Sequence, residues 1–375
     1  MTVPTLSAST LLIREATPAD DAQLCAQARR NAMPGRVSLV ASSEPSFFAA
    51  TEVEGYARRV VVGEQGGRVV GVGLMAKRRL YLNGEPTEVG YISSLRTDPS
   101  IRNTTAVVRG NRLFQRWHEE SFQAPLYLCA ILQENLLARR VLAAGRAGLP
   151  ESRELGTLYT AAIPLVRRRS HPLPPGLRVV RGGAVGAEAV VEALNRLGRA
   201  KQFFPVYTVE EVLSPEGTLR GLGLDDFHVA LAGDRVVGVA AGWDQLPFRR
   251  LVVEGYSLGL RLLRPPLALL AKALRLAPPP RVGEAVQSVL AACLAVEDSA
   301  PPVFAALLES MLQAATGTGR TFLLVGLMEQ DPLLAVARRY LHLPTCTCIY
   351  ALQWGGFADT PTLDDRVPYL ELGSL

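Results

Sequence analysis

Residues that bind metals or form disulfides are scarce in this sequence. Its 375 residues include five cysteines and four histidines, and the histidines lie far apart along the chain. The cysteines form an odd set without the spacing of a zinc site. Cys346 and Cys348 stand two positions apart in a strand-like segment, where alternation places both on one face, so we expect packing rather than redox chemistry. Neither a metal site nor a disulfide framework is expected.

The sequence also lacks a strong excess of one charge and a targeting segment. Forty basic residues are balanced by 35 acidic ones, which leaves a formal net charge of +5 spread over the whole chain. This bias suits an anionic ligand, but without clustered basic and aromatic residues it does not indicate nucleic-acid binding. The start, MTVPTLSASTLLIREA, has neither a basic stretch nor a long apolar run, so we expect a cytoplasmic protein.

The chain repeats the same order of segments. Its length suits about two domains, and self-similarity at a fixed interval is the sign of a repeated unit. Three pairs of segments carry the repeat: LLIREA at 11–16 with LRVVRG at 177–182, GGRVVGVG at 66–73 with GDRVVGVA at 233–240, and LYLCAIL from 126 with FLLVGLM from 322.

The third pair is more widely spaced than the others, so the second copy contains an insertion. The unmatched, leucine-rich segment at 256–285 is the obvious place for it. RRRSHPLPPG, rich in proline and arginine, reads as a linker between the copies. We therefore expect an N-terminal domain at 1–166, a linker at 167–176, a C-terminal domain at 177–357 and a tail at 358–375.

Hydrophobic periodicity and turn signals predict a strand and a helix, then an antiparallel meander, then a strand, a helix and a strand. The first helix begins after Thr17, where TPAD supplies a cap, a proline and an acid in the first turn. The expected strands are 10–15, 58–63, 68–76, 87–97, 125–131 and 157–163, with helices after Thr17, after Arg102 and from Asn135.

The segment DPSIRNTTAVVRG at 98–110 predicts the end of a strand and the start of a helix with Arg, Asn and Thr in its first turn. Backbone N–H groups at a helix start carry a partial positive charge, so an anion such as a phosphate binds there readily. A plain capped helix start would explain the threonines as well. We favour an anion site.

This order of elements, with LRTDPSIRNTTA after the fourth strand and QENLLARRVLAAG after the fifth, resembles the GNAT acyltransferase superfamily in a tandem arrangement. The resemblance implies an α/β layered fold of two GNAT-like domains, each a mixed, mainly antiparallel sheet flanked by helices. It also implies acetyl-CoA or another acyl-CoA as co-substrate, with no metal.

By the same resemblance, the end of the fourth strand pairs with the pantetheine arm, and the turn after it wraps the pyrophosphate. An Asn at the start of a later helix often contacts the cofactor. Thr105 and Val107 depart from the family pattern, which prefers small residues there. The residues in these positions are Leu95, Arg96 and Thr97 in the strand, Arg102, Asn103, Thr104, Thr105, Ala106 and Val107 in the turn, and Asn135.

Two residues are candidates for the general base that accepts the proton of an attacking amine. The carboxylate position of the family falls on Tyr91, while Glu88 lies three residues earlier, on the opposite face of a regular strand. Many members carry a tyrosine as general acid where this chain has Leu142.

The second copy has a different turn. VEDSAPPVF at 296–304 supplies Glu297, Asp298 and two prolines where a pyrophosphate would need amides and a cation. We therefore expect the cofactor in the first copy only, with the second copy forming a wall of the substrate site or a homodimer contact.

The resemblance implies transfer of an acyl group, most often acetyl, to a small-molecule or peptide amine by direct attack in a ternary complex. Two alternatives stay open: a non-catalytic ligand-binding or interaction module, and a long-chain acyltransferase that uses the insertion. We expect the acceptor pocket in the loops at 31–57 and 200–226.

The insertion holds RPPLALLAKALRLAPPP, which reads as a leucine helix between proline stops. It is shorter than a membrane span of about 20 apolar residues. It could rest on a membrane surface, line an acyl tunnel or cover another domain; we favour packing against protein over contact with a membrane.

Overall fold

The computed structural model describes residues 10–32, 35, 37–101, 105–143, 148–166, 173–273, 278–358 and 360–375. We call the part before residue 167 the first half and the part after residue 172 the second half. The first half contains β1 (Leu12–Glu15), α1 (Asp21–Arg30), β2 (Val37–Ser42), α2 (Phe47–Ala50), the 3-10 helix η2 (Thr51–Glu54), β3 (Ala57–Gln65), β4 (Arg68–Leu82), β5 (Glu85–Thr97), α3 (Ala106–Trp117), β6 (Tyr127–Leu132), α4 (Leu136–Ala143) and β7 (Glu151–Pro164).

The second half follows a similar order. Its elements are β8 (Leu177–Arg181), α5 (Ala187–Gly198), α6 (Val209–Leu213), β9 (Phe227–Ala232), β10 (Arg235–Trp243), β11 (Arg250–Tyr256), α7 (Leu258–Ala273), β12 (Ser288–Val296), the 3-10 helix η8 (Glu297–Ser299), α8 (Pro301–Ala315), β13 (Phe322–Met328), α9 (Leu334–Ala337) and β14 (Leu343–Gln353).

Local sequence signals account for many of these elements. The TPAD segment forms a capping box, in which the backbone N–H of Thr17 donates to Asp20 Oδ2 at 2.7 Å. Gly66 and Gly67, both with positive φ, turn β3 into β4, and the two strands pair antiparallel from Gln65↔Arg68 onward. The elements expected in the first half occur in the expected order, with β2 and α2 added between α1 and β3.

The strands combine into one mixed, mostly antiparallel sheet. Within the described residues, twelve strands lie in the order β1-β3-β4-β5-β6-β14-β7-β13-β12-β10-β9-β8. Two neighbouring pairs in this sheet, β5 with β6 and β12 with β13, are parallel. The sequence predicted a sheet in each half, and the structure joins the two edge to edge.

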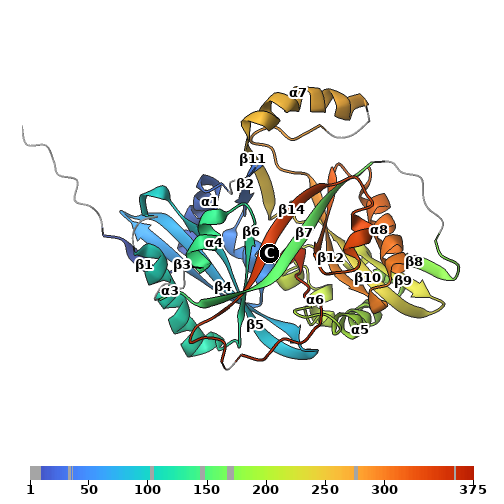
Figure 1. Ribbon diagram of the computed structural model, residues 1–375, viewed down its shortest axis with the longest axis horizontal. Helices are drawn as coiled ribbons and strands as arrows, with labels where there is room; N and C mark the ends of the chain where they lie inside the picture. Colours follow the sequence, from blue (N-terminus) through green and yellow to red (C-terminus); the bar gives the residue numbers. More distant parts are fainter. Residues whose placement is uncertain are drawn as a thin grey trace, which may run out of the picture.

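The two halves exchange their last strands. β7 of the first half pairs with β13 of the second, from Pro164↔Phe322 to Leu158↔Met328. In return, β14 pairs with β6, from Thr347↔Leu132 to Leu352↔Tyr127. The exchanged strands also pair with each other and run side by side through the middle of the molecule (Figure 1). Each half therefore completes the sheet of the other.

Helices cover both faces of the first-half sheet. Val60 and Val62 of β3 pack with Leu24 of α1, whereas Val61, between them, packs with Trp117 of α3. Alternate residues of a strand point to opposite faces, so α1 and α3 lie on opposite sides of the sheet. Trp117 and Phe122 are buried.

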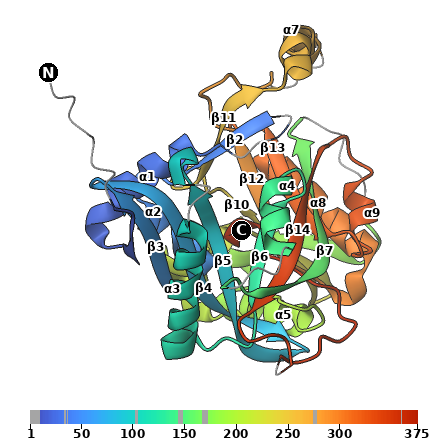
Figure 2. The same ribbon diagram turned by 60° about the vertical axis from the view of Figure 1, so that its left-hand side comes forward.

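Two elements differ from the sequence-based expectation. Segment 37–42, expected as loop, is strand β2, which pairs with β11 of the second half in a separate two-stranded sheet. α7 begins at Leu258 and continues through Pro265 and Pro266, so these prolines lie inside the helix rather than stopping it. α7 stands clear of the rest of the molecule, beyond β11 (Figures 1 and 2). None of the described helices is long and apolar enough to cross a membrane.

Candidate functional site

β5 and β6 part from each other soon after they meet. They pair at Gly90↔Tyr127 and Tyr91↔Leu128, whereas β5 pairs with β4 as far as Thr97. A side chain at Gly90 would place its Cβ 2.0 Å from the ring of Tyr127, so the absence of a side chain lets this ring pack across β5. We call the diverging ends of the two strands, 90–97 of β5 and 127–132 of β6, the first fork.

A β-bulge lies at the first fork. Ser94 has a φ of 53°, and the pairing with β4 shifts register between Leu74↔Ser93 and Val72↔Arg96. Ser94 and Leu95 together therefore stand opposite Gly73. Where β6 diverges, the edge of β5 offers main-chain groups to an extended ligand. Within the described residues, no side chain accepts a hydrogen bond from the backbone of Ser94 or Leu95.

The second half repeats this geometry. β12 and β13 pair in parallel as far as Ala291↔Val325, and Cys293, with a φ of 51°, lies in a bulge opposite β10. We call the diverging ends, 291–296 of β12 and 325–328 of β13, the second fork. The repeat seen in the sequence therefore extends to the backbone conformation of β5 and β12, the matching strands of the two halves.

The C-terminal segment fills the second fork. The backbone N–H of Cys293 donates to Glu371 Oε2 at 2.8 Å, and that of Leu294 donates to Tyr369 Oη at 3.1 Å. The side chain of Leu372 lies against Gly326 of β13. These main-chain donors are satisfied internally, so the two forks differ in what they offer a ligand.

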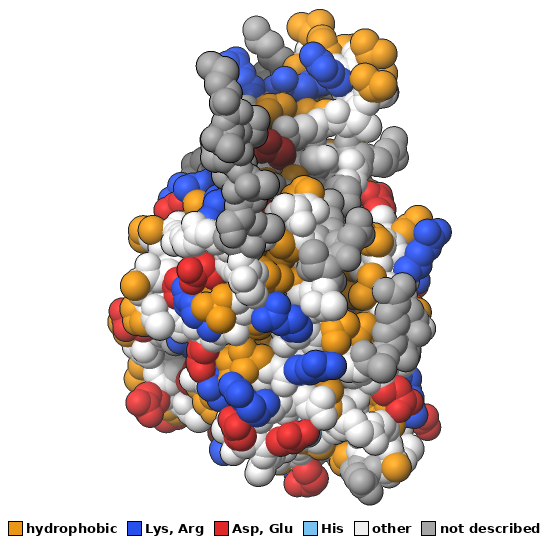
Figure 3. Space-filling model, turned by 90° about the vertical axis from the view of Figure 1, so that its left-hand side faces the viewer, with side chains coloured by type: hydrophobic (Ala, Val, Ile, Leu, Met, Phe, Trp, Pro, Cys, Tyr) orange, Lys and Arg blue, Asp and Glu red, His pale blue; other side chains and the backbone are white. Residues whose placement is uncertain are grey.

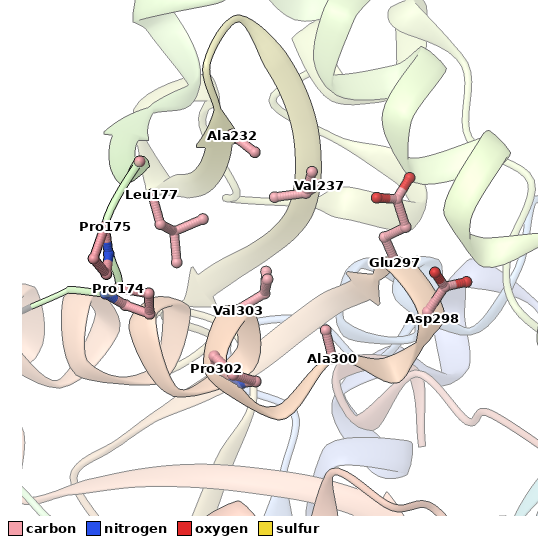
Figure 4. Close-up of a pocket in the computed structure, with 11 residues that line it drawn as sticks. Pro174, Pro175, Leu177, Ala232, Val237, Glu297, Asp298, Ala300, Pro302 and Val303 are labelled. Atoms are coloured by element: carbon pink, nitrogen blue, oxygen red, sulfur yellow. The ribbon is translucent and has the colours of Figure 1, made fainter.

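The helix start of the second half is also unsuited to a phosphate. A cavity of about 380 Å³ lies there, lined mainly by proline, valine, leucine and alanine, with Glu297 and Asp298 on one side (Figure 4). Glu297 is ion-paired with Arg196 at 3.3 Å and with Arg235. Both arginines are engaged by Glu297, Asp298 adds a negative charge, and Pro302 has no N–H to donate, so this helix start is poorly suited to a pyrophosphate.

A buried carboxylate lies beside the first fork. Glu54, at the end of η2, accepts a hydrogen bond from Ser93 Oγ, and Arg249 Nη2 lies 3.7 Å from its Oε1. Burial raises the pKa of the Glu54 carboxyl, against the opposing effect of Arg249. Burial also raises the pKa of Tyr91 well above its ordinary value, and the charge of Glu54 adds to this.

Gly55 positions this carboxylate. A Cβ at Gly55 would lie 2.5 Å from the carbonyl oxygen of Lys77, so η2 can approach β4 this closely only without a side chain there. The carbonyl of Gly55 accepts a hydrogen bond from Arg58 Nη1 at 2.7 Å. These contacts hold the end of η2 against the sheet.

Glu54 and Tyr91 line a small cavity between the two halves. Its volume is about 50 Å³, and its walls include Phe203 and Pro205 of the second half and Glu371 of the C-terminal segment. This volume is enough for a water molecule or a small group. A carboxylate that can accept a proton therefore adjoins a space beside β5.

The two predicted base candidates are not brought together. Tyr91 lines the cavity with Glu54. Glu88 instead pairs with Arg79 of β4 at 3.3 Å, before the point where β5 and β6 part, and it does not line this cavity. Burial raises the pKa of Glu88.

The predicted cofactor residues lie along the first fork and beyond it. Leu95 is exposed, and Arg96 and Thr97 are half-buried. Burial, and then the nearby charge of Arg249, lower the pKa of Arg96. Thr105 is the N-cap of α3, which continues through Ala106 and Val107, and its side chain makes no capping hydrogen bond. Arg102, Asn103 and Thr104 lie outside the described residues.

Asn135 caps its helix, because its Oδ1 accepts a hydrogen bond from the N–H of Ala138 at 3.2 Å. Among the described residues, no three His, Cys, Asp or Glu side chains come together in a way that could hold a metal ion.

Sequence reasoning missed three residues beside the first fork: Glu54, Ser93 and Arg249. Glu54 lies in the loop region expected to build the acceptor pocket, but nothing in TEVEGY distinguishes it from Glu52. Gly55, directly after it, is the one local sign of a close backbone approach. Arg249 comes from the other half of the chain, so no local pattern links it to Glu54.

Comparison with known proteins shows the fold. No protein-family model matches the sequence, and a search of curated proteins finds no match. Among solved structures, a GCN5-related N-acetyltransferase from Sphaerobacter thermophilus matches with a TM-score of 0.56 at 14% identity, over 95% of this chain and 98% of that one. A GCN5-related glucosamine N-acetyltransferase region in a fungal multi-domain GH3 β-N-acetylglucosaminidase matches with a TM-score of 0.60 at 11% identity, over 94% of this chain but 39% of that one. The chain therefore has the GNAT fold over nearly its whole length.

Proposed function

We propose that this chain is an acyl-CoA-dependent N-acyltransferase whose cofactor binds at the first fork. The observation that carries the proposal is the contrast between the two forks. Both have diverging parallel strands and a bulge, but the second is filled by Tyr369 and Glu371, and Asp298 and Pro302 stand at its helix start. The first fork keeps the edge of β5 available beside α3.

The residues present fit an extended thioester cofactor. The main-chain groups of Leu95 and Arg96 lie at the bulge on the diverging edge of β5 and can pair with an amide-containing arm. α3 begins at Ala106, soon after β5 ends, so its first N–H groups suit an anionic end. When bound, the cofactor supplies a thioester carbonyl that an amine can attack.

Glu54 is the residue we assign as general base. An amine is protonated at neutral pH and must lose a proton before it attacks. A carboxylate whose pKa is raised by burial is a better proton acceptor near neutral pH than an ordinary one. Tyr91, held protonated beside it, can donate a hydrogen bond within the same cavity. The amine attacks the thioester carbonyl directly while both are held in one complex, and the CoA thiol leaves. No covalent enzyme intermediate is therefore required.

Acetyl transfer to a primary amine is the reaction we favour. Both matched structures are named as N-acetyltransferases, and the fungal region is named for glucosamine. We take from these structures the reaction class, acyl transfer to an amine. The amine belongs to a small molecule or to a peptide end. A cavity of about 50 Å³ beside Glu54 suits a small reacting group.

Calorimetric titration with acetyl-CoA, free CoA and a long-chain acyl-CoA tests the cofactor. We expect acetyl-CoA and free CoA to bind with one site per chain. Arg102→Glu should weaken both by about tenfold or more, because it reverses a charge at the expected pyrophosphate turn. Arg112→Glu is the matched control. Arg112 is exposed on α3, but it lies more than one helical turn after Ala106, where α3 begins.

If neither acetyl-CoA nor free CoA binds, the proposal that the chain uses acetyl-CoA is wrong. If the long-chain acyl-CoA does not bind either, the non-catalytic alternative remains. Preference for the long-chain thioester would favour the long-chain alternative. Equal weakening by the two arginine variants would show a diffuse electrostatic effect instead of a site at the turn.

A further inference from the structure

Several leucines of helix α7 are exposed to solvent. Leu258, Leu262 and Leu269 are 80%, 79% and 70% exposed. At 100° per residue, these three and the exposed Pro265 form a stripe along one side of the helix, while Ala271, on the other side, is buried. A surface helix of a globular protein normally turns its apolar stripe toward the core. The stripe of α7 points the other way.

The inner side of α7 contacts the end of β11. The Arg264 guanidinium lies 5.6 Å from the centre of the Tyr256 ring, and Tyr256 Oη donates a hydrogen bond to the carbonyl of Pro280 at 2.6 Å. Tyr256 is the last residue of β11, which pairs with β2 of the first half. Arg264 therefore turns one side of α7 toward β11, and the leucine stripe lies on the side away from it.

The charge of this segment has one sign. From Gly255 to Gly283 the chain contains no Asp or Glu, and it contains Arg261, Arg264, Lys272, Arg275 and Arg281. Hydrophobic and basic side chains lie together at the end of the molecule that α7 forms (Figure 3). Exposed leucines with basic and no acidic residues are typical of a helix that lies on an anionic lipid surface.

A second copy of the chain fits this surface less well. In a symmetric contact the segment would meet itself, so its cations would meet the same cations; among those whose side chains the structure describes, only Arg281 has an acid close by, Glu284 at 3.9 Å, just after the segment. An anionic bilayer offers both partners that the segment needs, an apolar boundary for the leucines and phosphates for the arginines.

We propose that α7 docks this protein on a bilayer surface that contains anionic lipid. The 16 residues of α7 lie along the surface, with Leu258, Leu262 and Leu269 in the acyl boundary and Arg261 at the headgroups. This placement replaces packing against protein, which the sequence alone favoured for the insertion. It does not depend on the proposed enzymatic reaction.

Flotation of the purified full-length protein with vesicles tests the proposal. We expect binding to vesicles of phosphatidylcholine with phosphatidylglycerol, little binding to phosphatidylcholine alone, and release as the salt concentration rises. The double variant Leu258→Asp, Leu262→Asp should lower the bound fraction by about tenfold or more. Both sites are exposed, so its thermal midpoint should match that of the wild type, which shows that it is folded.

Leu341→Asp is the matched control, because Leu341 is 72% exposed and lies between α9 and β14, outside α7. It should bind vesicles as the wild type does. Absence of binding to anionic vesicles at low salt, equal binding to neutral vesicles, or an equal loss in the control would each overturn the proposal. A concentration-dependent dimer that the double variant abolishes, without vesicle binding, would instead assign the stripe to a second copy.

Discussion

Ser94 in β5 and Cys293 in β12 hold the same position in the two halves of the chain. Each has a left-handed backbone, with φ of 53° and 51°, and each lies in a bulge where a parallel partner strand diverges. Left-handed conformations are unfavourable for residues other than glycine and persist where the surrounding structure fixes them. Both halves therefore retain the strained fork, although the C-terminal segment satisfies the backbone donors of only the second.

Replacement of Glu54 by Gln should slow acyl transfer by about 10²–10⁴-fold with little change in acyl-CoA affinity, because the variant keeps the shape of the side chain but cannot accept a proton. Release of free CoA with a screened amine measures the rate. The wild-type rate should rise with pH through the raised pKa of Glu54, and this rise should be absent in the variant.

Glu52→Gln is the matched control for this prediction. Glu52 belongs to the same short helix but pairs with Arg220 at 2.8 Å, away from Ser93. A similar loss of rate in both variants would mean that η2, and not the carboxylate of Glu54, limits activity.

Gly90→Ala should destabilise the protein by about 3 kcal/mol, because the new Cβ would lie 2.0 Å from the Tyr127 ring in a fully packed region. Denaturant unfolding measures the change. Gly110→Ala provides the contrast: Gly110 lies in α3, and a Cβ added there would meet nothing within 4 Å, so its replacement should stabilise the protein by about 0.5–1 kcal/mol. A neutral Gly90→Ala would show that Tyr127 can move away from β5.

Tyr369→Phe should lower the free energy of unfolding by about 1–3 kcal/mol, because it leaves the buried N–H of Leu294 without its acceptor and removes the bond to Glu371. Tyr340→Phe, which removes a half-exposed hydroxyl bonded to Glu309, should cost less. The affinity for acetyl-CoA should stay unchanged in both, and a loss of affinity in Tyr369→Phe alone would place the cofactor in the second fork.

His228 should make the protein sensitive to acid. Burial and the neighbouring Arg181 lower its pKa from 6.5 to about 3. The folded state therefore binds fewer protons than the unfolded state between these values, and stability present above pH 6.5 is lost as the pH falls toward 3. In His228→Gln the slope over this window should decrease by up to about 1.4 kcal/mol per pH unit. Equal slopes in wild type and variant would refute the assignment to His228.

Much of the first half could be predicted because its signals are local. Turn glycines, strand alternation and the TPAD cap are read from neighbouring residues, and the order of elements then places Leu95 to Thr97 beyond the point where the strands part. The exchange of β7 and β14 could not be predicted in this way. Either strand satisfies the same local pattern, and only long-range packing selects its partner.

The residues of the candidate site that could not be predicted from the sequence also depend on long-range packing. Glu54 carries no motif, and its burial depends on the close approach of Gly55 to Lys77, a contact between distant segments. Residues 358–375 read as a tail, yet Tyr369 and Glu371 complete the second half. The domain boundaries, the cytoplasmic location and a homodimer stay predictions.

We propose that acyl-CoA binds at the first fork and not at the second. Hydrogen–deuterium exchange with and without acetyl-CoA locates the binding site without a mutation, because backbone N–H groups that bond to the cofactor exchange more slowly. We predict protection of peptides that contain Leu95 to Thr97 and the start of α3, with no change in peptides that contain Cys293 and Leu294. Protection of the second fork, or of neither fork at a saturating concentration, would contradict the account.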